Sequence, residues 1–208
     1  MFYDYLKETY GEDEPIFVSK IHYKNSSANY IQQQIKKLTD AGLIKKYDKG
    51  IYFIPQKSIF KSGSQLSSYK VIELKYLKDG NQRCGYVCGI TFANQLGLTT
   101  QVPMVREITT NKATSDYRKI KIAYSPVILR KPKVEVTNDN YMILQLLDLL
   151  TNLKFYSEIK GKELTDRLIS YMKSCGFQFD DLKRYLPLYP DKIYKNMYKS
   201  GLLYGLPA

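Results

Sequence analysis

Amide, hydroxyl and lysine side chains between residues 26 and 41 recur with the spacing of one exposed helix face. At 100° per residue, this face points away from the apolar positions of the same segment. Its members are Ser26, Asn29, Tyr30, Gln33 and Lys37, with Lys36 on the flank. Amide side chains hydrogen-bond adenine in the major groove, and lysines contact phosphates. The face therefore predicts binding to duplex DNA, with Ser26 and Tyr30 reaching phosphates or a thymine methyl group.

The apolar positions of this segment predict the helix that would present the polar face. They are Ala28, Ile31, Ile35 and Leu38. Spacings of three and four residues form one stripe along a 3.6-residue helix, which favours burial of that stripe. Ser26 and Ser27 are both suitable N-caps, and Gly42 stands where a helix ends. We expect a helix that runs through Ala41.

A basic hairpin is predicted directly after this helix. The apolar period changes to two residues in the runs 43–47 and 51–55, which is typical of strands. Asp48-Lys49-Gly50 separates the two runs and supplies the glycine that a tight hairpin needs. The side chains expected on DNA are Lys45, Lys46, Tyr47 and Lys49, together with Ser27 at the start of the helix.

The first 57 residues have the element order of a winged helix-turn-helix. Residues 2–10 predict a short amphipathic helix, and residues 16–23 predict an extended entry into a helical turn. The longer helix and the hairpin follow, which completes the order of that DNA-binding fold.

The charge of the chain supports a polyanionic partner. The sequence has 32 Lys+Arg against 20 Asp+Glu, a formal net charge of +12. Residues 15–57 contain eight lysines and two aspartates. A basic surface concentrates phosphates near the protein and speeds their encounter with it.

Several segments resemble the AbiEi antitoxins, the antitoxin half of bacterial type IV toxin–antitoxin systems. Residues 44–55, IKKYDKGIYFIP, resemble the wing of that family, and residues 35–44, IKKLTDAGLI, fit the helix ahead of it. Residues 85–91, GYVCGIT, and 96–103, LGLTTQVP, resemble the opening of the second domain in related proteins. The resemblance covers most of residues 15–153, and the last fifty residues lie outside it.

The resemblance implies a two-domain regulator. The N-terminal winged helix would bind inverted repeats in its own promoter and repress the operon. The C-terminal domain would be needed to neutralise a nucleotidyltransferase-like toxin encoded beside it. In type IV systems the antitoxin counters the effect of the toxin without a stable complex between the two proteins.

We expect an α+β protein in three parts. Residues 1–57 would form the winged helix-turn-helix, 58–158 an α+β antitoxin-like domain, and 159–208 a helical C-terminal region. Helices are predicted over residues 66–78, 91–96, 141–153, 162–174, 180–185 and 191–203. Strands are predicted over residues 104–110, 117–124, 127–130 and 134–136. Asn138-Asp139 would cap the helix that begins at residue 141.

The sequence contains no recognisable catalytic or metal-binding constellation. His22 is the one histidine, and a triad or zinc site needs a histidine set among partners. Cys84 and Cys88 have tolerable metal spacing but lack two further ligands nearby. Gly63-Ser64 could open a nucleotidyltransferase motif, but no Asp-x-Asp follows. We therefore expect no enzyme activity, no cofactor and no metal.

The location and one alternative function also follow from the sequence. No stretch approaches the roughly 20 apolar residues that span a bilayer, and Asp4 and Glu8 replace the basic flank of a signal peptide. A cytoplasmic protein without a membrane partner is expected.

The alternative to DNA binding is a protein-interaction module in which the winged helix is a scaffold and the tyrosine-rich C-terminal helices bind a partner.

Overall fold

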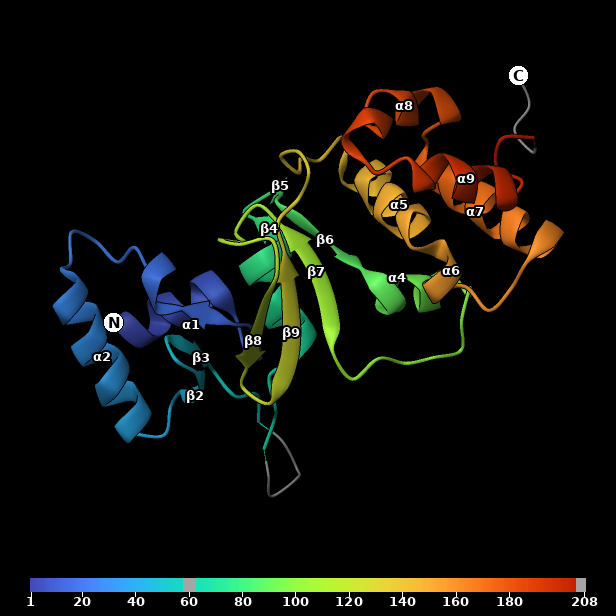
Figure 1. Ribbon diagram of the computed structural model, residues 1–208. Helices are drawn as coiled ribbons and strands as arrows, with labels where there is room; N and C mark the ends of the chain where they lie inside the picture. The colour runs from blue at the N-terminus through green and yellow to red at the C-terminus, as the bar shows by residue number, and fades with distance from the viewer. Residues whose placement is uncertain (58–62, 205–208) are drawn as a thin grey trace. The chain divides into compact units, whose positions relative to one another are not determined.

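A computed structural model describes residues 1–57 and 63–204 of the chain (Figure 1). Helices and small sheets both occur, which confirms an α+β protein. The chain divides into two compact units. Unit 1 contains residues 1–75 together with Ile122–Tyr124, and unit 2 contains residues 76–121 and those from 125 onward. Residues 58–62, at the start of the predicted second domain, lie outside the described part.

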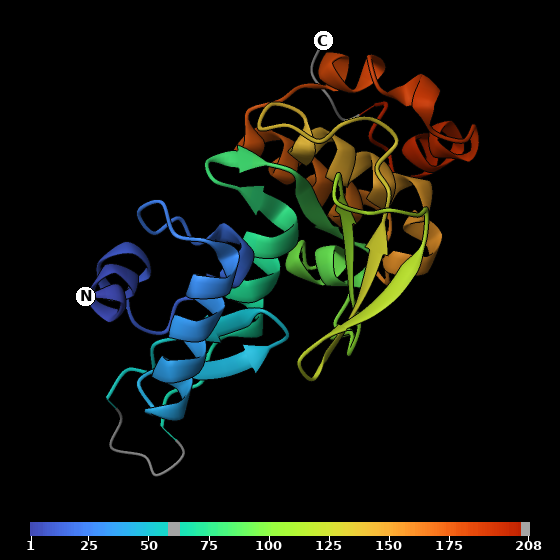
Figure 2. The same cartoon turned by 90° about the vertical axis from the view of Figure 1, so that its left-hand side faces the viewer.

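Unit 1 begins with the predicted helix and strand entry. Its elements are α1 (Phe2–Tyr10), β1 (Ile16–Phe17), the 3₁₀ turn η1 (Val18–Lys20), α2 (Ala28–Asp40), β2 (Lys45–Asp48) and β3 (Ile51–Phe53). The three strands pair in the order β1-β3-β2. Both neighbours run antiparallel to β3, and Tyr52 stands opposite Ile16 on one side and Lys46 on the other. Figure 2 shows α2 beside the β2–β3 hairpin.

The core of unit 1 is formed by apolar side chains from segments along most of its length. It contains Phe2, Leu6, Ile16, Ile21, Ile31, Ile35, Ile44 and Ile54. The prediction of an apolar stripe on α2 is therefore right for Ile31 and Ile35. It is wrong for Ala28, which is exposed, and only partly right for the half-buried Leu38. The ends of α2 extend past the core, so only its middle turns are covered.

The α-helix predicted over residues 66–78 is shorter in the structure, and it continues as a π-helical turn. The structure has α3 (Ser68–Ile72) followed by a π-helical turn, η2 (Glu73–Leu77). The spacing of Val71, Leu74 and Leu77 predicts one buried face, but Leu74 is exposed. A π-turn adds a residue to the helical period, so the 3.6-residue alternation fails there.

Two small sheets lie in the second part of the chain. The strands are β4 (Lys78–Asp79), β5 (Gln82–Arg83), β6 (Gly85–Cys88), β7 (Arg106–Thr110), β8 (Arg118–Ile122) and β9 (Ser125–Arg130). β4 pairs with β5, and the larger sheet has the order β6-β7-β9-β8. β7 pairs antiparallel with β6 and parallel with β9. Residues 134–136 form no strand, contrary to the prediction, and β6 is not among the predicted strands.

Helices of unit 2 pack around the buried helix α5. They are α4 (Gly89–Gln95), α5 (Tyr141–Thr151), α6 (Leu153–Tyr156), α7 (Gly161–Cys175), α8 (Phe179–Lys183), the 3₁₀ turn η3 (Leu186–Leu188) and α9 (Lys192–Lys199). Leu146 of α5, Leu168 of α7 and Met197 of α9 belong to one buried cluster. The predicted cap is wrong: Asn140 stands at the N-cap of α5, and Asn138 Oδ1 instead accepts a hydrogen bond from Arg83 N at 2.6 Å.

The division into units differs from the predicted three parts. The boundary after residue 57 falls inside unit 1, and the helices after residue 159 share the core of unit 2. Leu66, Val71 and Ile72 are buried, which gives the segment after the predicted boundary an apolar anchor. In the described residues, no helix combines the length and apolar character needed to cross a bilayer.

Candidate nucleic-acid interface

Helix α2 begins and ends at the residues that the sequence marks for capping. Ser27 is the N-cap, and its Oγ accepts a hydrogen bond from Tyr30 N at 3.3 Å. Ala41 is the C-cap, and Gly42 follows with a φ of 70°, a left-handed conformation that glycine adopts at little cost. The local sequence thus sets the length of the helix and the direction of its polar face.

The polar face of α2 is open to solvent. Five of the side chains predicted to contact DNA are exposed on it: Asn29, Tyr30, Gln33, Lys36 and Lys37. Ser27 is exposed as well, and Ser26 is half-buried. Ile31 and Ile35 are buried on the opposite side of the helix, so amphipathicity orients this surface outward. We call these seven residues the α2 face.

The β2–β3 hairpin carries the other predicted contacts. Lys45, Lys46 and Lys49 are exposed, whereas Tyr47 is half-buried. The strand register shifts between Lys46 and Asp48, so Tyr47 is the extra residue of a β-bulge. The tip closes at Gly50, whose φ is 70°. The three lysines form a second cationic surface, which we call the hairpin lysines.

Asp48 anchors the hairpin to a distant segment. Its Oδ1 accepts a hydrogen bond from Lys49 N at 2.7 Å, and its Oδ2 accepts one from Ala123 N at 2.9 Å. Partial burial raises the pKa of this carboxyl group, but the two amide donors, together with Lys75 and Lys46, outweigh burial and lower the pKa below its ordinary value. Sequence reasoning missed this role, because nothing local marks a partner 75 residues away.

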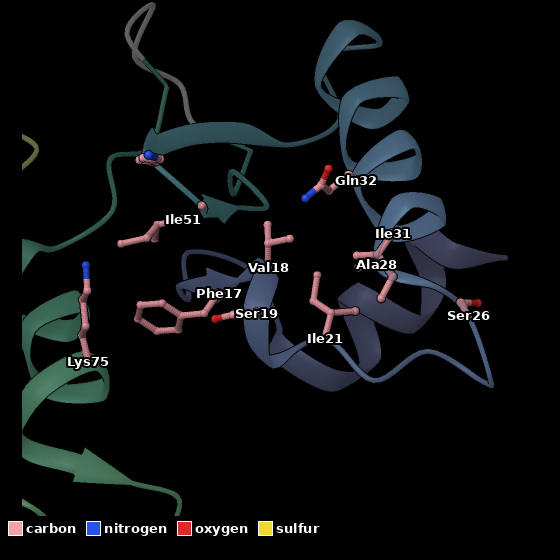
Figure 3. Close-up of a pocket in the computed structure, with 12 residues that line it drawn as sticks. Phe17, Val18, Ser19, Ile21, Ser26, Ala28, Ile31, Gln32, Ile51 and Lys75 are labelled. Carbon is pink, nitrogen blue, oxygen red and sulfur yellow. The ribbon is translucent and has the colours of Figure 1, made fainter. Parts of the chain in front are cut away.

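A hollow of about 540 Å³ lies between η1, the first turns of α2 and the hairpin tip. Apolar and polar side chains both line it, and Figure 3 shows Ala28 and Ile31 near Ile21, with Gln32 facing Val18. Ser19, Ser26 and Lys49 also line it. Ala28 is exposed because this hollow, and not the core, lies beneath it. The hollow places apolar surface next to the α2 face.

The histidine and cysteines that the sequence offers for catalysis or metal binding do not form a site in the described residues. His22 is exposed, and its main-chain carbonyl accepts a hydrogen bond from Tyr5 Oη at 2.8 Å. Cys84 and Cys88 are buried free thiols. Among residues 1–57 and 63–204, no three histidine, cysteine or acidic side chains are grouped so that they could hold a metal ion.

The geometry of unit 1 therefore consists of a capped amphipathic helix with a polar outer face and a lysine-bearing hairpin beside it.

No protein-family model matches this chain, and no curated protein matches its sequence.

Proposed function

We propose that unit 1 is a winged helix-turn-helix that binds duplex DNA, with α2 as the recognition helix and the β2–β3 hairpin as the wing. One observation carries the proposal: Asn29, Tyr30 and Gln33 are exposed on the side of α2 opposite its buried isoleucines. A helix presented in this way fits the major groove, where amide side chains distinguish adenine.

Two further observations support the proposal. The strand order β1-β3-β2, with a helical turn and a longer helix inserted after β1, is the arrangement expected for a winged helix. The hairpin lysines are exposed beside α2, where they would neutralise phosphates that flank the groove.

We propose that this DNA binding represses transcription of the protein's own operon in the cytoplasm. The resemblance of residues 35–55 and 85–103 to AbiEi antitoxins supports an autorepressing antitoxin of a type IV system. Its operator would contain inverted repeats, and its functional counterpart would be a nucleotidyltransferase-like toxin that forms no stable complex with it.

Fluorescence anisotropy on labelled DNA from upstream of the gene tests this function. We expect the unmodified protein to bind this DNA more tightly than a shuffled duplex. The triple variant Asn29→Ala/Lys36→Ala/Lys37→Ala removes one base contact and two phosphate contacts. We expect it to lose at least about tenfold in affinity, since a base contact alone contributes about 1–3 kcal/mol.

The matched control removes two exposed lysines of unit 2. Lys160→Ala/Lys173→Ala lowers the net charge by the same amount as the triple variant, because Asn29 is uncharged. Equal losses of DNA affinity in the control and the triple variant would indicate attraction by charge alone. Unchanged affinity in the triple variant would exclude α2 as the recognition helix.

A protein-interaction module is the second candidate, and exposed tyrosines at the C-terminal end of the described chain favour it. Tyr194, Tyr198 and Tyr204 are 46%, 58% and 71% exposed, and the rings of the last two pack edge to face at 5.5 Å. Tyrosines are enriched at protein interfaces. Purification of a stable complex, together with an absence of salt-sensitive DNA binding, would select this function.

A further inference from the structure

Unit 2 contains a cavity of about 540 Å³ where β6, β7 and β9 meet α5 and α6. Its volume lies within the range of about 300–1,000 Å³ that small-molecule sites occupy. The charged and hydroxyl side chains that matter for its chemistry are Glu107, Arg130, Lys131, Lys133, Asp148 and Tyr156. They come from four separate segments, so the fold brings them together.

A partly buried ion pair forms one wall of the cavity. Glu107 Oε2 accepts a hydrogen bond from Arg130 Nε at 2.9 Å and lies 2.8 Å from Arg130 Nη2. Within the described part of the chain, Glu107 Oε1 accepts no hydrogen bond. Gly89 leaves room for this oxygen, because a Cβ added there would lie 3.1 Å from it. One carboxylate oxygen is therefore held in place by the ion pair and remains able to accept a hydrogen bond.

Asp148 provides a second acceptor from the middle of α5. Its Oδ2 accepts hydrogen bonds from Tyr86 Oη at 2.8 Å and Thr109 Oγ1 at 3.1 Å. Burial raises the pKa of Asp148, although these donors, the Tyr189 hydroxyl and the charge of Arg130 act in the opposite direction. Two hydroxyl groups thus orient this carboxyl group.

Charged groups placed in this cavity stabilise the folded protein less than apolar side chains would. The Arg130 side chain is still 40% exposed, whereas that of Glu107 is only 19% exposed. The free-energy cost of withdrawing charge from water therefore falls on Asp148 and Glu107, and hydrophobic residues of similar size would not incur it. Charged groups gathered in a cavity with a perturbed pKa are characteristic of binding sites. The hydrogen-bonding groups of the cavity therefore indicate the chemistry of a ligand.

Two lysines and one aspartate, Asp116, are exposed at the mouth of the cavity, so its net charge is positive. Lys131 and Lys133 follow β9 directly and are both exposed. Tyr156 adds an aromatic ring and a hydroxyl group, and burial raises the pKa of that hydroxyl to about 12, so it stays protonated and can donate a hydrogen bond at neutral pH. The inner part thus offers acceptors for N–H groups, and the mouth offers cations for an anion.

We propose that this cavity binds a nucleoside phosphate whose base carries adjacent N–H donors, as guanine does. The base edge would donate to Glu107 and Asp148, and the phosphate would contact Lys131 and Lys133. Enzymes and binding proteins read nucleobases by hydrogen bonds to this edge and by contact with aromatic rings. The proposal does not depend on DNA binding by unit 1.

Isothermal titration of the full-length protein tests the proposal with five probes: GMP, AMP, guanosine, ribose 5-phosphate and inorganic phosphate. GMP carries both the donor edge and the phosphate, so we expect it to bind at least about tenfold more tightly than each of the others. Lys131→Ala/Lys133→Ala should weaken GMP binding about tenfold and leave guanosine binding unchanged. The control is Lys160→Ala/Lys173→Ala, which should match the unmodified protein.

Glu107→Gln tests the base end separately, because it keeps the shape of the side chain while replacing one acceptor oxygen. We expect this variant to lose the preference for GMP over AMP. The rim variant Lys131→Ala/Lys133→Ala lies on the surface and keeps the test informative if Glu107→Gln fails to fold. Absence of heat with GMP at millimolar concentration, equal binding of GMP and inorganic phosphate, or full GMP binding by the rim variant would each overturn the proposal.

Discussion

The carboxyl group of Asp48 shows how a single residue connects segments far apart in the chain. It bonds to the amide of its neighbour Lys49 and to that of Ala123, which adopts a φ of 50°. This conformation is unusual for a residue other than glycine and needs local support. The hydrogen bond from Ala123 N supplies that support, and the one from Lys49 N holds Asp48 at the hairpin tip.

Replacement of Asp48 by alanine should therefore destabilise unit 1. We expect a loss of about 1 kcal/mol in the free energy of unfolding at pH 7, the typical net value of a hydrogen bond. The pKa of Asp48 is lowered in the folded state, so its contribution is present above the unfolded pKa and is lost as the pH falls through the folded pKa. Urea unfolding at pH 7 and in acid measures both effects. Glu8→Ala, at an exposed position on α1, is the control, and an Asp48→Ala protein of undiminished stability at pH 7 would contradict the assignment.

Tyr86 and Asp148 form the corresponding buried contact in unit 2. The pKa of Asp148 is raised when the protein is folded, so between the unfolded and folded pKa values the folded state binds more protons than the unfolded state. The stability that this group contributes is therefore present below the unfolded pKa and is lost as the pH rises through the folded pKa. Tyr86→Phe removes a donor to the charged form and raises the pKa of Asp148 further. We expect a loss of roughly 1.5–3 kcal/mol in the free energy of unfolding at pH 8, since hydrogen bonds to charged groups are in this range, and a smaller loss at pH 4.

Chemical unfolding at the two pH values measures this difference. Tyr194→Phe removes an exposed hydroxyl group and should have no effect at either pH. An equal loss for Tyr86→Phe at pH 4 and pH 8 would mean that the hydrogen bond does not depend on the charge of Asp148.

At the level of elements, α2 combines a structural requirement with the proposed contact surface. Ser27 caps the helix and also belongs to the α2 face. Ser27→Ala should cost about 0.5–2 kcal/mol, the usual value of a lost N-cap. Ser27→Asp keeps a capping oxygen and adds a negative charge on the side that would meet phosphates. We expect its thermal stability to equal that of the unmodified protein while its DNA affinity falls.

Ser27→Asn is the matched control, because it keeps a capping oxygen without the charge. Thermal unfolding and fluorescence anisotropy on the same samples separate the two effects. If Ser27→Asp and Ser27→Asn bind DNA equally well, the N-terminal end of α2 does not face the duplex.

Helices and turns with local signals can be predicted from the sequence, and elements that depend on distant contacts cannot. Gly42 and Gly50 mark the end of α2 and the tip of the hairpin, because the left-handed backbone there favours glycine whatever packs nearby. The prediction for Leu74 is wrong because the backbone changes to a π-turn, which the 3.6-residue pattern does not reveal. The role of Asp148 has no local signal, since its partners Tyr86 and Thr109 lie far away in the sequence.

At the scale of the whole molecule, the net charge of +12 is spread over both units. If about six lysines contact phosphates, the logarithm of DNA affinity should fall with the logarithm of salt concentration at a slope near −5. Lys46→Ala/Lys49→Ala should make that slope less steep by about 2, since each lost phosphate contact removes about 0.9. Lys160→Ala/Lys173→Ala should leave it unchanged. Anisotropy titrations from low to moderate salt measure the slopes, and equal slopes in all three proteins would place the hairpin lysines away from the DNA.

Short-range patterns are sufficient to define α2 and the β2–β3 hairpin of this protein, though not every local element. Caps, turn glycines and apolar periodicity depend on residues within a few positions of one another, so α2, its polar face and the lysine hairpin follow from the chain alone. Long-range pairing required the folded molecule: β7 runs parallel to β9, Ile122–Tyr124 belongs with unit 1, and Glu107, Arg130 and Asp148 line one cavity. These features depend on contacts between distant segments, and local patterns in a single chain carry no information about which distant segments meet.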